Sequence, residues 1–254
     1  MKSIKNIEYI SGGGNAQSLD IYLPKTSGFD TFIFFHGGGI TNGDKADSFA
    51  DVLSKHYTEN GIAFISANYR MYPDGAKFPD YLEDAAAAVA YVNNCIKNHG
   101  GNGRIFVGGS SAGGYISMML CYDAKYLGAH GIAPEQLAGY IHDAGQPTTH
   151  FNILELERGM DRRRVIIDEA APLYHIGEAK EYAPQLLFVS DNDIKNRYEQ
   201  TVLTVSTLRD LGYDMSKVEL KVMKGFGHTK YVAALDEQGD SLFGKITTDF
   251  MKRV

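Results

Sequence analysis

Eight short apolar runs, rich in β-branched and aromatic residues, recur along the chain, and segments with helical periodicity separate most of them. Phe32-Ile33-Phe34-Phe35 and Ile105-Phe106-Val107 are apolar without alternation, as expected for strands covered on both faces. Helices between strands favour parallel pairing through right-handed crossovers. The predicted strands are 4–10, 18–23, 31–36, 62–67, 104–109, 137–142, 185–190 and 218–223, and the predicted helices are about 45–59, 79–99, 112–127, 197–211 and 240–252.

The segments around these strands set the expected architecture. Gly12-Gly13-Gly14-Asn15 separates the first two predicted strands as a hairpin turn would. We therefore expect an α/β fold: an eight-stranded, mostly parallel sheet with an antiparallel N-terminal edge and helices on both faces. A chain of 254 residues with 44% hydrophobic residues can fill one domain, 1–254. Residues 143–180 are polar and irregular, which indicates a lid-like insertion over the carboxyl edge or an ordinary surface excursion.

The balance of charge argues against several classes of partner. The net charge is −6, from 25 basic and 31 acidic residues, which opposes nucleic-acid binding and an obligate anionic partner. Asp161 and Asp168-Glu169 flank the run Arg162-Arg163-Arg164 and predict a solvated, internally paired segment. Cys95 and Cys121 are expected to be buried free thiols. Without a membrane-length run or an apolar signal region, we expect a cytoplasmic protein with no membrane partner, unless a signal peptide has been removed.

Two glycine motifs follow predicted strands and carry the candidate chemistry. His36-Gly37-Gly38-Gly39 follows one strand, and Gly109-Ser110-Ser111-Ala112-Gly113 joins another strand to a helix. The second motif has the Gly-x-Ser-x-Gly form of a nucleophile turn, and only Ser111, not Ser110, has glycine two residues away on both sides. A phosphate-binding loop would need lysine where Gly114 stands, and a dinucleotide loop would need glycine at Ser110. The motif therefore predicts Ser111 as a nucleophile.

The eight strands and these two motifs together resemble the α/β-hydrolase fold. The form of the motifs is similar to that of the hormone-sensitive-lipase-like esterases and the small carbohydrate esterases. The resemblance implies an oxyanion hole made of the backbone N–H groups of Gly38, Gly39 and Ala112, and a structural role for His36.

The resemblance also indicates where the acid and the base lie. Asp193, three residues after Ser190 at the end of the seventh predicted strand, aligns with the acid; Asp191 is the neighbouring alternative and Asp143 a more distant one. His228 follows the eighth strand between glycines and is the predicted base, whereas His142 and His150 precede the acid. The order Ser111, Asp193, His228 is the nucleophile–acid–base order of this fold.

The predicted reaction is two-step acyl transfer on a small-molecule ester. The hormone-sensitive-lipase-like esterases that the chain resembles usually carry a larger N-terminal cap, whereas only about 30 residues precede the first central strand here. This departure argues against long-chain lipid substrates, so we expect a short-acyl, acetyl-like ester, with a carbohydrate as one candidate alcohol. Tyr69, Tyr72, Gln146 and His150 are predicted to line the site. No cofactor is expected, and no catalytic metal, since no His-Glu-x-x-His motif or cysteine cluster is present.

Other activities remain open at this point. An aryl-formamidase, an amidase or a feruloyl-type esterase would use the same residues, whereas a non-catalytic binding module would need a damaged triad. The sequence also leaves a homo-oligomer open.

Overall fold

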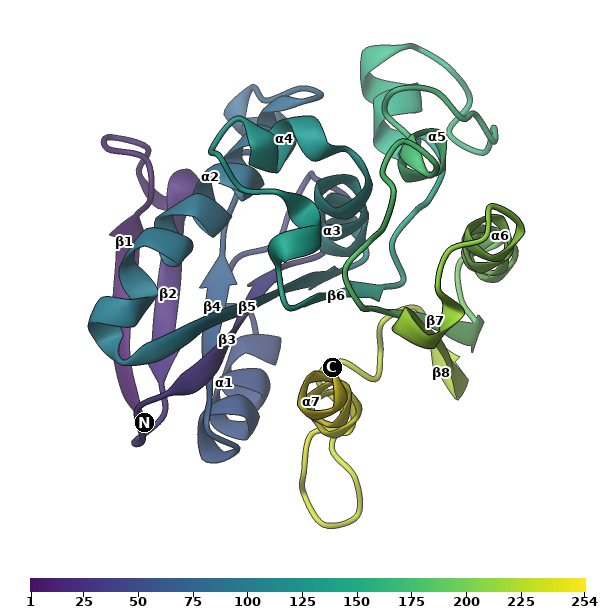
Figure 1. Ribbon diagram of the computed structural model, residues 1–254. Helices are drawn as coiled ribbons and strands as arrows, with labels where there is room; N and C mark the ends of the chain where they lie inside the picture. Colours follow the sequence, from purple (N-terminus) through teal and green to yellow (C-terminus); the bar gives the residue numbers. More distant parts are fainter.

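The computed structural model describes residues 1–254 and contains one mixed sheet of eight strands in the order β1-β2-β4-β3-β5-β6-β7-β8 (Figure 1). β1 (Lys2–Glu8) pairs antiparallel with β2 (Ser18–Leu23), and β2 pairs antiparallel with β4 (Ile62–Ala67). Every other pairing is parallel. The remaining strands are β3 (Phe29–Phe35), β5 (Gly101–Ser110), β6 (Gly139–Asp143), β7 (Gln185–Asn192) and β8 (Val218–Gly227). The predicted mostly parallel sheet with an antiparallel N-terminal edge is confirmed.

Helices cover both faces of the sheet (Figure 1). On β3, Phe32 and Phe34 pack into one apolar cluster, whereas Ile33 and Phe35 pack into the other, because successive side chains of a strand point to opposite faces. The first cluster also holds side chains of α1 (Phe49–Glu59) and α7 (Leu242–Arg253). The second holds side chains of α2 (Asp80–Cys95), α3 (Ala112–Tyr122) and α6 (Arg197–Asp210). The continuously apolar runs are thus strands buried on both sides.

The helix predicted over 112–127 is two helices. α3 ends at Tyr122 and α4 runs over Ala124–Gly128. Asp123 between them is extended, with φ −102° and ψ 96°, and its side chain accepts a hydrogen bond from the backbone N–H of Lys125. A short acceptor side chain of this kind favours an N-cap over a helix interior, which explains the break.

Shorter helical turns complete the chain. The helix predicted over 79–99 is α2 followed by a separate 3-10 turn that ends at Gly100, whose φ is +97°. Six strands extend beyond one or both of their predicted bounds, because backbone pairing continues beyond the apolar run: β1, β3, β5, β6, β7 and β8. The remaining elements are the 3-10 turns Asn15–Gln17, Tyr72–Asp74, Ile96–His99, Pro134–Gln136 and Met215–Lys217, the π-helix Ile153–Glu157, and α5 (Pro172–His175).

The segment between β6 and β7 is anchored to the body of the protein. The Tyr115 hydroxyl on α3 donates a hydrogen bond to the carbonyl of Ala170 at 2.8 Å. At its other side, Glu157 Oε1 accepts hydrogen bonds from the Tyr72 hydroxyl at 2.7 Å and from the Phe78 backbone N–H at 2.9 Å. These contacts hold the segment in a defined position beside the sheet.

The six parallel strands, β3 to β8, have their carboxyl ends at one edge of the sheet. Phe35 at the end of β3 pairs with Gly109, and Ser110 at the end of β5 pairs with Asp143 at the end of β6. Asn192 on β7 pairs with Gly227 on β8. Loops that follow these strand ends therefore converge, as ligand sites do in open α/β sheets. No helix has the length and apolar character needed to cross a membrane.

Candidate active site

Ser111 occupies a strained turn between β5 and α3. Its φ is 57° and its ψ is −108°, a conformation that non-glycine residues rarely adopt. Glycine is required on both sides of it: a Cβ on Gly113 would lie 1.9 Å from the carbonyl oxygen of Phe35, and one on Gly109 would lie 2.5 Å from the carbonyl carbon of Gly113. The Ser111 backbone N–H donates to the Asp143 carbonyl at 2.8 Å. The glycines thus let α3 begin directly against the strands.

A chain of hydrogen bonds connects Ser111, His228 and Asp193. The Ser111 hydroxyl lies 2.8 Å from His228 Nε2, and His228 Nδ1 lies 2.6 Å from Asp193 Oδ1. Asp193 accepts through an ionised oxygen, so Nδ1 carries the proton and Nε2 is free to accept the proton of the serine. Ser110 is engaged elsewhere, because its hydroxyl donates to Asp143 Oδ2 at 2.6 Å.

Asp193 is held as a buried carboxylate. Its side chain is 1% exposed. Burial by itself would raise its pKa, but the hydrogen bond from His228 and those from the backbone N–H groups of Ser190 and Ile194 outweigh burial and leave the pKa below the ordinary 3.8. Those backbone bonds measure 3.1 and 2.8 Å. An ionised Asp193 fixes the imidazole tautomer and would stabilise an imidazolium.

The triple-glycine turn carries N–H groups with no backbone acceptor. Gly38 and Gly39 have φ of 104° and 65°, and a Cβ on Gly38 would lie 1.8 Å from the Asn42 carbonyl oxygen. Neither of their N–H groups donates to a backbone carbonyl, and the Ala112 N–H, at the first position of α3, has no partner within the helix. These three groups are the ones predicted to stabilise an oxyanion.

A cavity of about 780 Å³ opens over these groups. The sheet side contributes Gly38, Gly39, Ser111 and His228. The segment between β6 and β7 contributes a whole wall: Phe151, Asn152, Glu155, Leu156 and Arg162. Asn152 also bridges the two sides, since its side-chain amide donates to the Gly39 carbonyl at 2.6 Å.

Comparisons with known proteins match parts of this chain. A family model described as BD-FAE matches residues 19–137. The probable isoprenylcysteine alpha-carbonyl methylesterase ICMEL2 of Arabidopsis thaliana is 32% identical over 125 residues, which cover 48% of this chain and 29% of that protein. Esterase LipI of Mycobacterium tuberculosis is 32% identical over 124 residues, 47% of this chain and 38% of LipI. The chain thus matches well under half of the length of either relative.

The fold match extends over the whole chain. A truncated form of a carbohydrate esterase from gut microbiota superposes with a TM-score of 0.78 at 19% sequence identity, covering 100% of this chain and 96% of that one. The chain has the α/β-hydrolase fold. The fold recognised from the two glycine motifs is therefore confirmed.

The two tyrosines predicted to line the site do not line the cavity over Ser111. Tyr69 is fully buried; its ring stacks on His36, with centroids 4.5 Å apart, and its hydroxyl donates to the His36 carbonyl at 2.8 Å. Tyr72 is directed to Glu157 instead. Both therefore brace loops around the cavity. The expectation that they line it is corrected, because position near the carboxyl edge does not fix the direction of a side chain.

Two further predicted lining residues are also displaced from the Ser111 cavity. His150 is 1% exposed and stacks under Phe151, with ring centroids 4.3 Å apart. Phe151, the next residue, is the one that reaches the cavity. Gln146 lines a second cavity beside the first. Phe151 and Arg162 were missed at the sequence level, where only the length and polarity of their segment indicated a wall.

Asp143 has hydrogen-bond partners of its own, distinct from those of Asp193. It is completely buried, and its two oxygens accept hydrogen bonds from the hydroxyls of Ser110 and Tyr231. Burial raises the pKa of Asp143 to about 6, although both hydroxyls oppose the shift. Its oxygens are engaged by these hydroxyls, and Asp193 is the carboxylate that contacts the ring of His228. The geometry separates Asp143 from the acid position.

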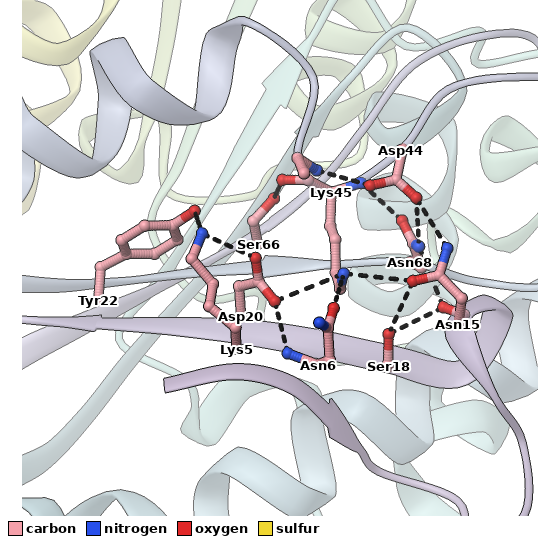
Figure 2. A network of polar contacts seen from close by, with 11 residues as sticks. Lys5, Asn6, Asn15, Ser18, Asp20, Tyr22, Asp44, Lys45, Ser66 and Asn68 are labelled. Atoms are coloured by element: carbon pink, nitrogen blue, oxygen red, sulfur yellow. Dashed lines mark hydrogen bonds and ion pairs between the residues drawn. The ribbon is translucent and has the colours of Figure 1, made fainter. Parts of the chain in front are cut away.

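A polar network holds Lys45, which follows the triple glycine in the loop after β3 (Figure 2). Lys45 on this loop is buried, and its ammonium group lies 3.4 Å from Asp20 Oδ1 and donates to Asn6 Oδ1 at 2.8 Å. Its backbone N–H donates to Asn68 Oδ1 at 2.6 Å, and its carbonyl accepts from the Ser66 hydroxyl at 2.7 Å. The loop is thereby attached to β1, β2 and the end of β4.

Proposed function

We propose that this α/β-hydrolase is a serine carboxylesterase that acts through an acyl-enzyme on Ser111. The observation that carries the proposal is the continuous hydrogen-bonded chain from Ser111 through His228 to Asp193, with distances of 2.8 and 2.6 Å, beside the free N–H groups of the triple-glycine turn. Proteins similar to this chain are named as esterases, which supports the same chemistry.

The geometry supports a two-step reaction. His228 Nε2 takes the proton of Ser111 as its oxygen attacks the ester carbonyl, and the carbonyl oxygen becomes an oxyanion bound by the N–H groups of Gly38, Gly39 and Ala112. The imidazolium then protonates the departing alcohol. Water attacks the acyl-enzyme, giving its proton to His228, and the carboxylic acid leaves while Ser111 regains its proton.

The proposed substrate is an ester of a short, acetyl-like acyl group with a bulky, polar alcohol such as a carbohydrate. The cavity beside Ser111 is wide, and several of its walls are polar: Thr41, Asn42, Asp47, Asn152 and Glu155. Such groups can hydrogen-bond hydroxyl-rich alcohols. The structural likeness to a carbohydrate esterase supports the same substrate class.

Active-site labelling and turnover test the proposed activity together. We expect Ser111→Ala to abolish hydrolysis of p-nitrophenyl acetate and labelling by a fluorophosphonate, because no other hydroxyl contacts His228 Nε2. The matched variant Ser110→Ala should still be labelled by the fluorophosphonate, because its Ser111 is intact. Labelling of the Ser111→Ala protein at wild-type rate would refute the assignment.

Acyl-length selectivity tests the finer proposal. For p-nitrophenyl esters, kcat/KM should be highest for acetyl and should fall steadily toward decanoyl. Release of acetate from acetylated sugars should also be detected. Preference for long acyl chains would overturn the short-acyl proposal and leave the esterase proposal standing.

A further inference from the structure

A second cavity adjoins the one over Ser111. It measures about 390 Å³ and lies where the segment after β6 meets the start of α6. Phe151, Arg162 and Ile194 line both cavities. The guanidinium of Arg162 also lies over the ring of Phe151, 4.4 Å from its centroid. The two cavities therefore adjoin at these three side chains.

The second cavity is strongly cationic in a chain that is acidic overall. Its lining includes five basic side chains and no carboxylate, whereas the whole chain has a net charge of −6. We call it the basic pocket; its cationic residues are Arg162, Arg163, Arg164, Lys195 and Arg197. Such a concentration of one charge in a concave site raises the local concentration of oppositely charged ligands.

The basic pocket keeps unpaired positive charge. Arg162 pairs with Glu155 at 3.1 Å and Arg163 pairs with Asp161, but Arg164 and Lys195 form no ion pair. The acidic neighbours expected to neutralise the arginine run, Asp168 and Glu169, pair with Arg158 instead. The prediction that all of Arg162-Arg163-Arg164 is internally paired is therefore wrong for Arg164.

Arg197 supplies a buried charge at the base of the pocket. It is only 4% exposed, and its guanidinium donates to two neutral acceptors, the carbonyl of Ala144 and Gln146 Oε1, the latter at 3.3 Å. No carboxylate lies within 4.0 Å of it, and the nearby Asp193 and Asp143 are engaged by other donors. Burying a charge without a counter-ion is costly unless a ligand supplies one.

The start of α6 adds to this field. Lys195, Asn196 and Arg197 line the pocket, and Arg197 is the first residue of this 14-residue helix. The N-terminal end of a helix carries partial positive charge and favours anions. The fork of N–H groups on arginine matches a carboxylate, and the apolar side chains of Phe151 and Ile194 suit one attached to a carbon ring or chain.

We propose that the basic pocket binds a carboxylate on the alcohol part of the ester, so that the preferred substrates are short-acyl esters of acidic alcohols such as uronic acids. This rests on the proposed short-acyl esterase function, because an acetyl group is too small to reach from Ser111 into the second cavity. The carboxylate supplies the counter-ion that Arg164, Lys195 and Arg197 lack in the protein.

A matched pair of acetyl esters tests the pocket. 3-Acetoxybenzoate carries a carboxylate, whereas 3-acetoxybenzamide has nearly the same shape without the charge, and both release acetate. We expect the double variant Arg164→Glu, Lys195→Glu to lower kcat/KM for the benzoate at least about 10-fold at low salt while changing the benzamide less than about 2-fold. The control is Lys55→Glu, Lys252→Glu, which changes the net charge equally on exposed sites of α1 and α7.

Other outcomes decide the remaining questions. Equal losses on both esters, or no loss on the benzoate, would overturn the basic pocket as a carboxylate site. If the wild-type protein hydrolyses neither ester, the short-acyl proposal fails, and calorimetric binding of the same two compounds to the Ser111→Ala protein tests the pocket by itself. We expect the Ser111→Ala protein to bind the benzoate more tightly than the benzamide, and we expect this difference to disappear when Arg164→Glu and Lys195→Glu are added. Equal binding of both compounds to the Ser111→Ala protein would overturn the proposal.

Discussion

Asp191 and Asp193 lie two residues apart, yet they occupy different environments. The side chain of Asp193 is buried and contacts His228, whereas Asp191 is exposed and accepts a hydrogen bond from the Gly225 backbone N–H at 2.8 Å. We expect Asp193→Asn to lower kcat by about 10⁴, because an amide no longer fixes the productive tautomer or stabilises the imidazolium. Steady-state kinetics with p-nitrophenyl acetate measure the effect. Asp191→Asn is the control, and a larger loss in that variant would assign the acid to Asp191.

Asp143 contributes to the free energy of unfolding by an amount that depends on pH. Its folded-state pKa of about 6 lies above the ordinary 3.8, so the folded protein keeps a proton that the unfolded chain releases between these two values. The contribution of Asp143 to stability is therefore largest below about pH 4, falls as the pH rises to about 6, and is constant above that. The difference between the two values corresponds to about 3 kcal/mol.

The variant Asp143→Asn measures this contribution, because the groups that do not interact with Asp143 titrate alike in both proteins. The wild-type free energy of unfolding minus that of the variant should decrease by about 3 kcal/mol between pH 4 and pH 7. Urea unfolding followed by circular dichroism at several pH values measures the difference. A difference that does not change with pH would show that Asp143 keeps one ionisation state across this range.

The positions of the three proposed catalytic residues could be predicted from the sequence, because strands place them and the resemblance to a known fold gives their order along the chain. Ser111, Asp193 and His228 each follow a strand whose apolar run is visible in the sequence, and parallel strands bring their carboxyl ends together. Side-chain direction was not predictable. Tyr69 and His150 lie near the same edge, but each turns into the core, where stacking partners distant in the sequence or in another loop decide its orientation.

At the scale of elements, close contact between α3 and the sheet depends on Gly113. The hypothetical Cβ at this position would overlap the backbone of Phe35 on β3, which cannot rotate away as a side chain could. We expect Gly113→Ala to lower the free energy of unfolding by about 1–3 kcal/mol or more. Thermal unfolding should show a fall in Tm of about 5 °C or more.

Gly128→Ala is the matched control for this element. Gly128 ends α4, and nothing lies within 4 Å of a Cβ built there. Alanine is the better helix former, so this variant should unfold at the wild-type temperature or above it. Equal Tm values for Gly113→Ala and the wild type would show that α3 can move away from the strands without cost.

The insertion was the element least defined by its sequence. Its length and polarity indicated that it would lie near the carboxyl edge, but its path depends on contacts with distant segments, such as Asn152 with Gly39 and Glu157 with Tyr72. Its π-helix, Ile153–Glu157, has no simple periodic signal. The wall of the cavity and the basic pocket therefore emerge only when the insertion is placed against the sheet.

For the molecule as a whole, Lys45 connects the N-terminal hairpin to the loop of the triple glycine. Lys5 also pairs with Asp20, at 3.0 Å, so Asp20 keeps one cation when Lys45 is removed (Figure 2). We expect Lys45→Met to lower the free energy of unfolding by about 3 kcal/mol, near the lower end of the cost of breaking a buried pair. Chemical unfolding of this variant measures the loss, with the exposed Lys55→Met as the control.

The double variant Lys45→Met, Asp20→Leu separates the ion pair from the packing. If the cost of Lys45→Met comes from leaving Asp20 short of a cation, replacing Asp20 as well should recover part of the lost stability, and the two changes should be non-additive by more than about 0.5 kcal/mol. Because the same network holds the loop that carries Gly38 and Gly39, kcat for p-nitrophenyl acetate should fall in Lys45→Met and not in Lys55→Met. Strict additivity, with kcat unchanged, would mean that the hairpin and the glycine loop are independent.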